Sequence, residues 1–139
     1  MILSRNIDPR AVFAQQPVSI VCNEGASVAG VVVGSLILPF KGKVVSAKFY
    51  CAALTDADDS VTIDLLKNGS TVLAAPVDPV AADTTTALAP TAAGSLFNAD
   101  DRYSLKVTTG VGDAIRGTLV LVVRPLLGGQ ELADNASLI

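Results

Sequence analysis

The sequence has no histidine, no tryptophan and only two glutamates, Glu24 and Glu131. Without histidine it lacks the commonest general base, the Ser-His-Asp and Cys-His arrangements, and nearly every zinc site. Any pair of carboxylates for acid–base chemistry would have to come from loop aspartates. Without tryptophan, the exposed Tyr50 beside Lys48 is a poor platform for a sugar ring. We therefore predict that the chain is not an enzyme and that it uses no cofactor.

Cysteine is also scarce, with Cys22 and Cys51 alone in 139 residues. Two cysteines are too few for a disulfide scaffold, and their spacing matches no metal-binding motif. Both fall on the predicted inward faces of strand-like runs. Two interpretations stay open: a pair of buried thiols packing as small apolar groups, or a cross-strand disulfide.

Charge is sparse and apolar residues are plentiful. Hydrophobic residues make up 50% of the chain, charged residues 17%, and mean hydropathy is +0.53. The basic residues are scattered and the net charge is −3, which predicts no binding to nucleic acid. The apolar surplus indicates strands that are apolar on both faces, the second face being covered by the chain itself or by another subunit.

No run reaches the ~18 consecutive apolar residues of a membrane helix. The longest apolar stretch, residues 28–40, is interrupted by two glycines and Pro39, which suits strands better. The start of the chain places Arg5, Asp8 and Arg10 where a secretory signal would be apolar. We therefore expect no membrane partner and synthesis in a cytoplasm.

Alternation of apolar and polar residues with period two dominates the chain, and no segment of ten or more residues has a helical period. Gly30 or Gly34 is the expected place of a bend or bulge, and Asn68-Gly69 is typical of a tight type I′ hairpin. The expected strands, separated by turn residues, cover residues 17–22, 27–38, 44–52, 60–67, 70–74, 84–88, 102–109 and 114–124. This pattern predicts an all-β fold, an antiparallel β-sandwich of jelly-roll or Greek-key type.

The same alternation predicts which side chains point into the core. The predicted inward residues are Val18, Ile20, Cys22, Val45, Ala47, Phe49, Cys51, Val61, Ile63, Leu65, Tyr103, Leu105, Val107, Ile115, Leu119, Leu121 and Val123.

Asp56, Asp58 and Asp59 form the densest acidic cluster. Loop oxygen atoms suit Ca²⁺, but the spacing lacks the glycine and the closing glutamate of an EF-hand. The alternative is a set of solvated acids that favour turns through side-chain to backbone hydrogen bonds. We predict no metal site.

The chain divides into an N-terminal arm at 1–16, a sandwich domain at 17–124 and a C-terminal tail at 125–139. Its last strand exposes valines on the outward face, and both ends carry apolar residues without a strand or helix period. These features predict surfaces for partners. The candidate interface residues are Ile7, Phe13, Val120, Val122, Leu126, Leu127 and Leu138.

At this level of pattern the chain resembles a known family. Residues 42–75, "GKVVSAKFYCAALTDADDSVTIDLLKNGSTVLAA", followed by "LFNADDRYSLKVTTGVGDA" and a long final strand, resemble the jelly-roll head-decoration (cement) proteins of tailed double-stranded DNA bacteriophages. The order is also similar to the trimeric jelly rolls of complement globular heads, where the turn that enters the strand at 102–109 usually reads Gly-Asp. Here that turn reads Asp100-Asp101.

The resemblance implies a homotrimer on the capsid surface of a virion that bridges neighbouring copies of the major capsid protein and stabilises the head. Family members use extended termini to reach adjacent molecules, which would suit the arm and the tail. Two alternatives remain: a phage tail, neck or fibre component, and a carbohydrate- or cell-surface-binding module of the same fold.

Overall fold

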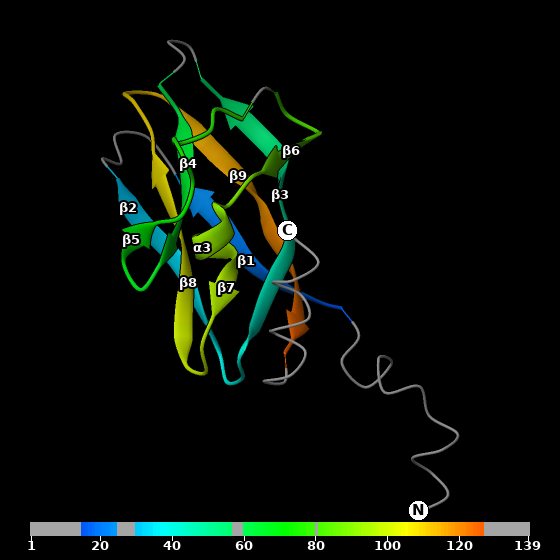
Figure 1. Ribbon diagram of the computed structural model, residues 1–139. Coiled ribbons are helices and arrows are strands. Elements are labelled where there is room, and N and C mark those ends of the chain that lie inside the picture. Colours follow the sequence, from blue (N-terminus) through cyan, green and yellow to red (C-terminus); the bar gives the residue numbers. More distant parts are fainter. Residues whose placement is uncertain (1–14, 25–29, 57–59, 80, 127–139) are drawn as a thin grey trace, which may run out of the picture.

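The computed structural model describes residues 15–24, 30–56, 60–79 and 81–126, and these form two antiparallel sheets packed face to face (Figure 1). Sheet A has the strand order β1-β9-β3-β6, with β7 also paired to β3, and sheet B has the order β2-β8-β4-β5. The bounds in sheet A are β1 Gln16–Glu24, β3 Gly42–Thr55, β6 Thr84–Leu88, β7 Leu96–Phe97 and β9 Ala114–Pro125. Those in sheet B are β2 Val31–Leu38, β4 Thr62–Lys67, β5 Ser70–Thr71 and β8 Asp101–Thr108.

The chain alternates between the two sheets as it runs. The first four strands lie in sheets A, B, A and B in turn, and β8 in sheet B is followed by β9 in sheet A. This winding brings the last strand between the first and third strands, as in a jelly roll. The predicted all-β sandwich is confirmed.

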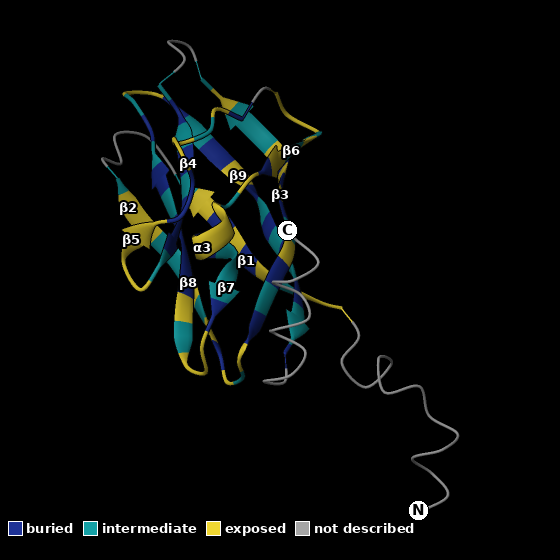
Figure 2. Ribbon diagram, viewed as in Figure 1, coloured by how far each residue is buried: buried dark blue, intermediate teal, exposed yellow. Residues whose placement is uncertain are grey.

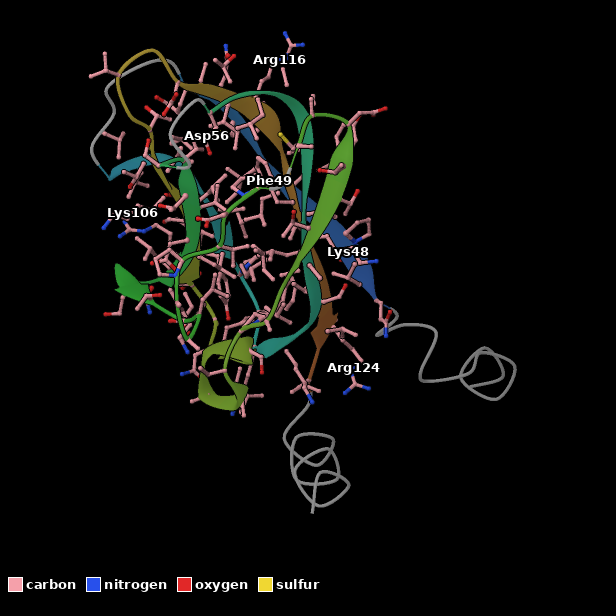
Figure 3. The ribbon with its side chains drawn as sticks, turned by 90° about the horizontal axis from the view of Figure 1, so that it is seen from above. Lys48, Phe49, Asp56, Lys106, Arg116 and Arg124 are labelled. Atoms are coloured by element: carbon pink, nitrogen blue, oxygen red, sulfur yellow. The ribbon has the colours of Figure 1, made fainter. Side chains whose placement is uncertain are left out.

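The core lies between the sheets, and the period-two prediction describes it well. Of the predicted inward residues, all but two are buried, and Val18 packs against the core from its margin. Figure 2 shows the complementary pattern, with exposed residues on β5, on α3 and along parts of β2. Figure 3, seen along the sandwich, shows Phe49 between the sheets and Lys48 directed away from them.

The other exception is Val45, which was predicted to point inward but is 43% exposed. The prediction was wrong because the register of β3 against β9 shifts between Val44 and Ser46. A bulge adds one residue to the strand, so the residue before it, Val44, takes the inward place instead. Alternation resumes at Ala47.

A second bulge, between Val32 and Gly34 in β2, confirms the bend predicted near that glycine. Gly34 is required by a close approach of the two sheets. A Cβ atom on Gly34 would lie 2.5 Å from the Cγ2 atom of Ile20, so only glycine lets β2 pass this close to β1.

The helix α3 spans only Ala92–Ser95, and the Thr91 side chain caps it by accepting a 3.0 Å hydrogen bond from the Gly94 amide. Gly94 also accepts a 2.6 Å hydrogen bond from the Tyr103 hydroxyl, which satisfies the polar end of a fully buried ring. Burial raises the pKa of Tyr103 far above its ordinary value. No helix in the described segments is long and apolar enough to cross a membrane.

The Asn-Gly hairpin between β4 and β5 has the predicted geometry, with φ of 52° at Asn68 and 88° at Gly69. The side chain of Asn68 ties this turn to the start of β8. Its amide nitrogen donates to Asp101 Oδ1 at 2.9 Å, and its carbonyl oxygen accepts from the Arg102 amide at 3.0 Å. The hairpin therefore serves to join two turns at one end of the sandwich.

Removing the Asp101 carboxylate should make the fold less sensitive to acid. The hydrogen bond from Asn68, with a second from the Asn98 amide, holds the pKa of Asp101 below its ordinary value of 3.8. A lowered folded-state pKa contributes stability above the unfolded-state pKa, and this stability is lost as pH falls through the folded-state value. We expect Asp101→Asn to lower the free energy of unfolding by about 1 kcal/mol at pH 7, since the site is largely solvated.

Urea unfolding between pH 7 and pH 2 checks this expectation. The difference between the native chain and Asp101→Asn should shrink below pH 4 and disappear at the acid end. Asp100→Asn, which removes the same charge from the same turn, is the control. Equal curves for the two variants would contradict the role given to the Asn68–Asp101 contact.

Candidate interaction surfaces

The outer side of sheet A, here called the A face, is a continuous surface formed mainly by β1, β9, β3 and β6. Cross-strand partners in an antiparallel sheet share a face, so the register identifies its members. Apolar and small side chains occupy its middle, with Val120 flanked by Ser19 and Lys48 on the two neighbouring strands. The A face consists of Pro17, Ser19, Val21, Asn23, Lys43, Ser46, Lys48, Tyr50, Thr85, Ala87, Arg116, Thr118, Val120, Val122 and Arg124.

The charged members of the A face all have the same sign. Arg116 and Arg124 stand at the two ends of β9, and Lys43 is the direct cross-strand partner of Arg124. Lys48 lies between them on β3 (Figure 3). Like charges directly opposite each other in a sheet are unfavourable, so this surface is electrostatically suited to a negatively charged neighbour.

Described carboxylates lie at the margins of the A face. Asp83 precedes β6 at one edge, where its Oδ1 atom accepts a 2.7 Å hydrogen bond from the Tyr50 hydroxyl. That hydrogen bond, followed by the negative charge of Asp83, raises the pKa of Tyr50. Glu24 ends β1 opposite the inward-facing Ile115 and, with Arg116, lines a shallow hollow of about 220 Å³.

The outer side of sheet B has a different charge pattern. Lys106 on β8 is the direct cross-strand partner of Asp64 on β4, so charges of both signs lie side by side there. Thr71 also donates a 2.8 Å hydrogen bond to Asp64. The side chain of Lys106 lies over Gly30, where an added Cβ atom would be 2.9 Å from its Cε atom. A surface of mixed charge has no preference for a partner of one sign.

The side of the sandwich where β1 and β2 meet is apolar, and we call it the β1–β2 edge. It is defined by Val21, Val31, Val32 and Ile37, four of the seven large exposed hydrophobic residues in the described part of the chain. Val21 is 69% and Ile37 62% exposed. All eight residues of β2 are uncharged, and its described pairing is with β8 alone. An apolar strand at the edge of a sheet is a template for association.

The two cysteines lie in one row of sheet A, on either side of Gly117 in β9. Neighbouring strands are about 4.8 Å apart, so the two Cα atoms are separated by about 9.6 Å. A disulfide requires less than about 7 Å, and both thiols are unbridged and buried. Of the two interpretations left open, the buried thiols are confirmed. Burial raises the pKa of Cys22 to about 11, which disfavours the reactive thiolate.

Asp56 acts within its own loop. Its Oδ1 atom accepts a 2.9 Å hydrogen bond from the Ser60 amide, the turn-stabilising alternative considered for the acidic cluster. Asp58 and Asp59 lie outside the described residues. The Ser60 hydroxyl donates in turn to the buried Asp113 at 2.8 Å and so braces this loop against the β8–β9 turn. In the described ranges, no three His, Cys, Asp or Glu side chains gather where they could hold a metal ion.

The predicted interface residues have different positions in the structure. Val120 and Val122 lie side by side on the A face, partly exposed. Leu126 was also predicted as an interface residue, but it is 5% exposed, with its amide donating to the Lys41 carbonyl at 2.9 Å. It is covered by its own chain because the backbone bond holds it against the end of the sandwich. Ile7, Phe13, Leu127 and Leu138 lie outside the described residues.

Sequence reasoning missed the basic members of the A face and the apolar β1–β2 edge. Alternation in residues 114–124 placed Val120 and Val122 outward, so one strand of the A face was visible. Lys43 and Lys48 join it only through the pairing of β3 with β9. The exposure of Ile37 was hidden because the bulge in β2 interrupts the alternation on which such a prediction depends.

The three-dimensional structure is similar to a chain of the capsid of Ralstonia phage GP4. The TM-score is 0.51 at 18% sequence identity, and the similarity covers 83% of this chain and 86% of that chain. The two chains share a fold. Comparison with known protein families and with curated protein sequences finds no match.

Proposed function

We propose that the chain is a virion structural protein of a tailed bacteriophage. It decorates the capsid surface as a trimer and stabilises the head by bridging neighbouring copies of the major capsid protein. The observation that carries the proposal is the fold shared with a phage capsid chain over most of both lengths. The role is adhesive rather than catalytic.

The surfaces of the domain support this role. A decoration protein needs one surface for the shell and another for its own copies. The A face is broad, with small and apolar side chains between basic ones, and suits the shell contact. The residues that define the β1–β2 edge are uncharged and offer an apolar surface to a second copy, with Lys106 and Arg102 on β8 opposite Val32 and Ile37.

The exposed β1–β2 edge is compatible with the proposed trimer. When the edge of one copy meets a different surface of the next, the contact is heterologous, and a ring closes if the rotation allows it. A threefold ring presents three A faces at once. Three weak contacts then act together, because each one raises the effective concentration of the others.

The native mass of the full chain, measured by light scattering, tests the assembly, and cosedimentation with phage heads that lack this protein tests the binding. We expect a trimer that sediments with the heads and raises their resistance to heat. A monomer that stays in the supernatant would overturn the proposal. Labelling of intact particles separates the alternatives, since a tail, neck or fibre component would appear away from the head.

A further inference from the structure

We propose that the A face docks on an acidic protein surface, with Lys48 and Arg116 as its main electrostatic contacts. This rests on the proposed function and adds the chemistry of the partner. The chain as a whole carries a net charge of −3, yet the charged members of the A face are all basic. Basic side chains are therefore gathered on one face of an acidic chain, which favours a negatively charged partner for that face.

The arrangement of the charges matches the usual anatomy of a protein–protein interface. Arg116 and Arg124 are eight residues apart on one strand, or about 27 Å. Thr118, Val120 and Val122 alternate outward between them. Apolar residues at the centre with charges toward the rim are typical of such interfaces, whose charged residues govern orientation and association rate. Arg116 and Arg124 follow this arrangement, whereas Lys48 lies beside Val120 in the middle of the face.

A nucleic acid fits this surface less well. Four basic side chains spread over a flat sheet, with valines between them, would neutralise few phosphates, whereas firm binding of duplex DNA uses about 6–10 phosphate contacts. Tyr50 is the aromatic member of the face, and its hydroxyl is bound to Asp83. Stacking of successive bases would need more aromatic side chains than this.

The size of the face explains why the contact should depend on assembly. Four strands at about 4.8 Å spacing are about 19 Å wide, and with about 27 Å of length they give a footprint of roughly 500 Å². A standard stable interface buries about 800 Å² on each partner. One A face alone therefore binds weakly, and its charge makes a correspondingly large contribution to recognition.

Two substitutions on the A face and a control on the opposite side of the molecule test the proposal on the full chain. Lys48→Gln and Arg116→Gln together remove two charges from exposed positions of the A face. Lys106→Gln removes one charge from the opposite side of the molecule (Figure 3). Circular dichroism should be the same for all the proteins, because these side chains lie outside the core.

The first readout needs no partner. We expect the native chain, despite its acidic pI of about 4.7, to be retained on a sulfonate resin at pH 7 and low salt. The double variant should elute early, while Lys106→Gln should elute near the native chain. If the native chain is not retained on the resin, the inference that its basic charges form a localised surface is wrong.

The second readout is cosedimentation with heads that lack this protein. We expect the double variant to bind at least tenfold more weakly than Lys106→Gln. Native binding should also weaken at least tenfold between about 0.1 M and about 1 M salt, as the Debye length falls from ~10 Å to ~3 Å. If neither the double substitution nor the higher salt concentration weakens binding, the proposal of an acidic partner is wrong, and the proposed decoration role still stands.

If the native chain itself does not bind the heads, the proposed decoration role is wrong, and so is the proposal of an acidic partner surface on the shell. A gel-shift assay with duplex DNA covers the remaining outcome. If DNA binds the native chain more tightly than the heads do, and the double variant abolishes that binding, the partner is a nucleic acid and the proposal is wrong.

Discussion

Replacing Gly117 by alanine is expected to destabilise the fold by more than about 3 kcal/mol, far above the cost of an ordinary surface change. An added Cβ atom would overlap the carbonyl oxygen of Tyr50 and lie 2.7 Å from the Cζ atom of Phe49. The oxygen belongs to the neighbouring strand β3, and the ring is completely buried. Neither can move without disturbing the centre of sheet A.

Equilibrium unfolding in urea measures this effect, and Gly112→Ala is the matched control. Gly112 has a φ of 81°, but nothing lies within 4 Å of an added Cβ atom. Its substitution reports backbone strain alone, worth about 1–3 kcal/mol. A Gly117→Ala protein as stable as the native chain would show that the sheet can yield at this point and that the close packing of Phe49 is not required.

Replacing Ile37 by aspartate is expected to convert the proposed trimer into monomers. Ile37 is a large exposed apolar residue near the end of β2, opposite Arg102 on β8, and an aspartate there would bring a charge into the contact between copies in an assembled ring. We expect the dissociation constant to rise at least a hundredfold, since such charges at the core of an interface cost about 3 kcal/mol or more. The isolated domain should change little in stability, because the side chain is solvated in the monomer.

Light scattering over a dilution series measures the effect, with Val111→Asp as the control. Val111 is 87% exposed in the β8–β9 turn, is not among the residues that define the β1–β2 edge, and receives the same chemical change. It should leave the mass unaltered. An Ile37→Asp chain that remains fully assembled would place the contact between copies on another surface.

The sequence by itself determined the class of the fold and most of its core. Period-two alternation needs no tertiary information, because side chains in a strand alternate wherever the strand lies. Tyr103, Leu105 and Val107 were therefore assigned inward correctly, and so was the long run of β9. The Asn68-Gly69 turn could also be predicted from the sequence, because the preference for positive φ at both positions is a local property of those residues.

The tertiary structure decided everything that depends on pairing. An extra residue in β3 reversed the orientation of Val45. Such a bulge depends on the pairing with another strand, so no local sequence pattern predicts its position. The cysteines share a row, yet β9 runs between them and keeps them apart, which sequence spacing could not reveal.

Surface properties were decided in the same way. Lys43, Lys48 and Arg116 are scattered along the sequence, and they share one face because β3 pairs with β9. Leu126 looked like part of a tail until its backbone bond to Lys41 placed it against the sandwich. The alternation of apolar and polar residues identifies which side of each strand is apolar. Only the assembly of the strands determines which side chains become neighbours, and thus which surfaces a partner can recognise.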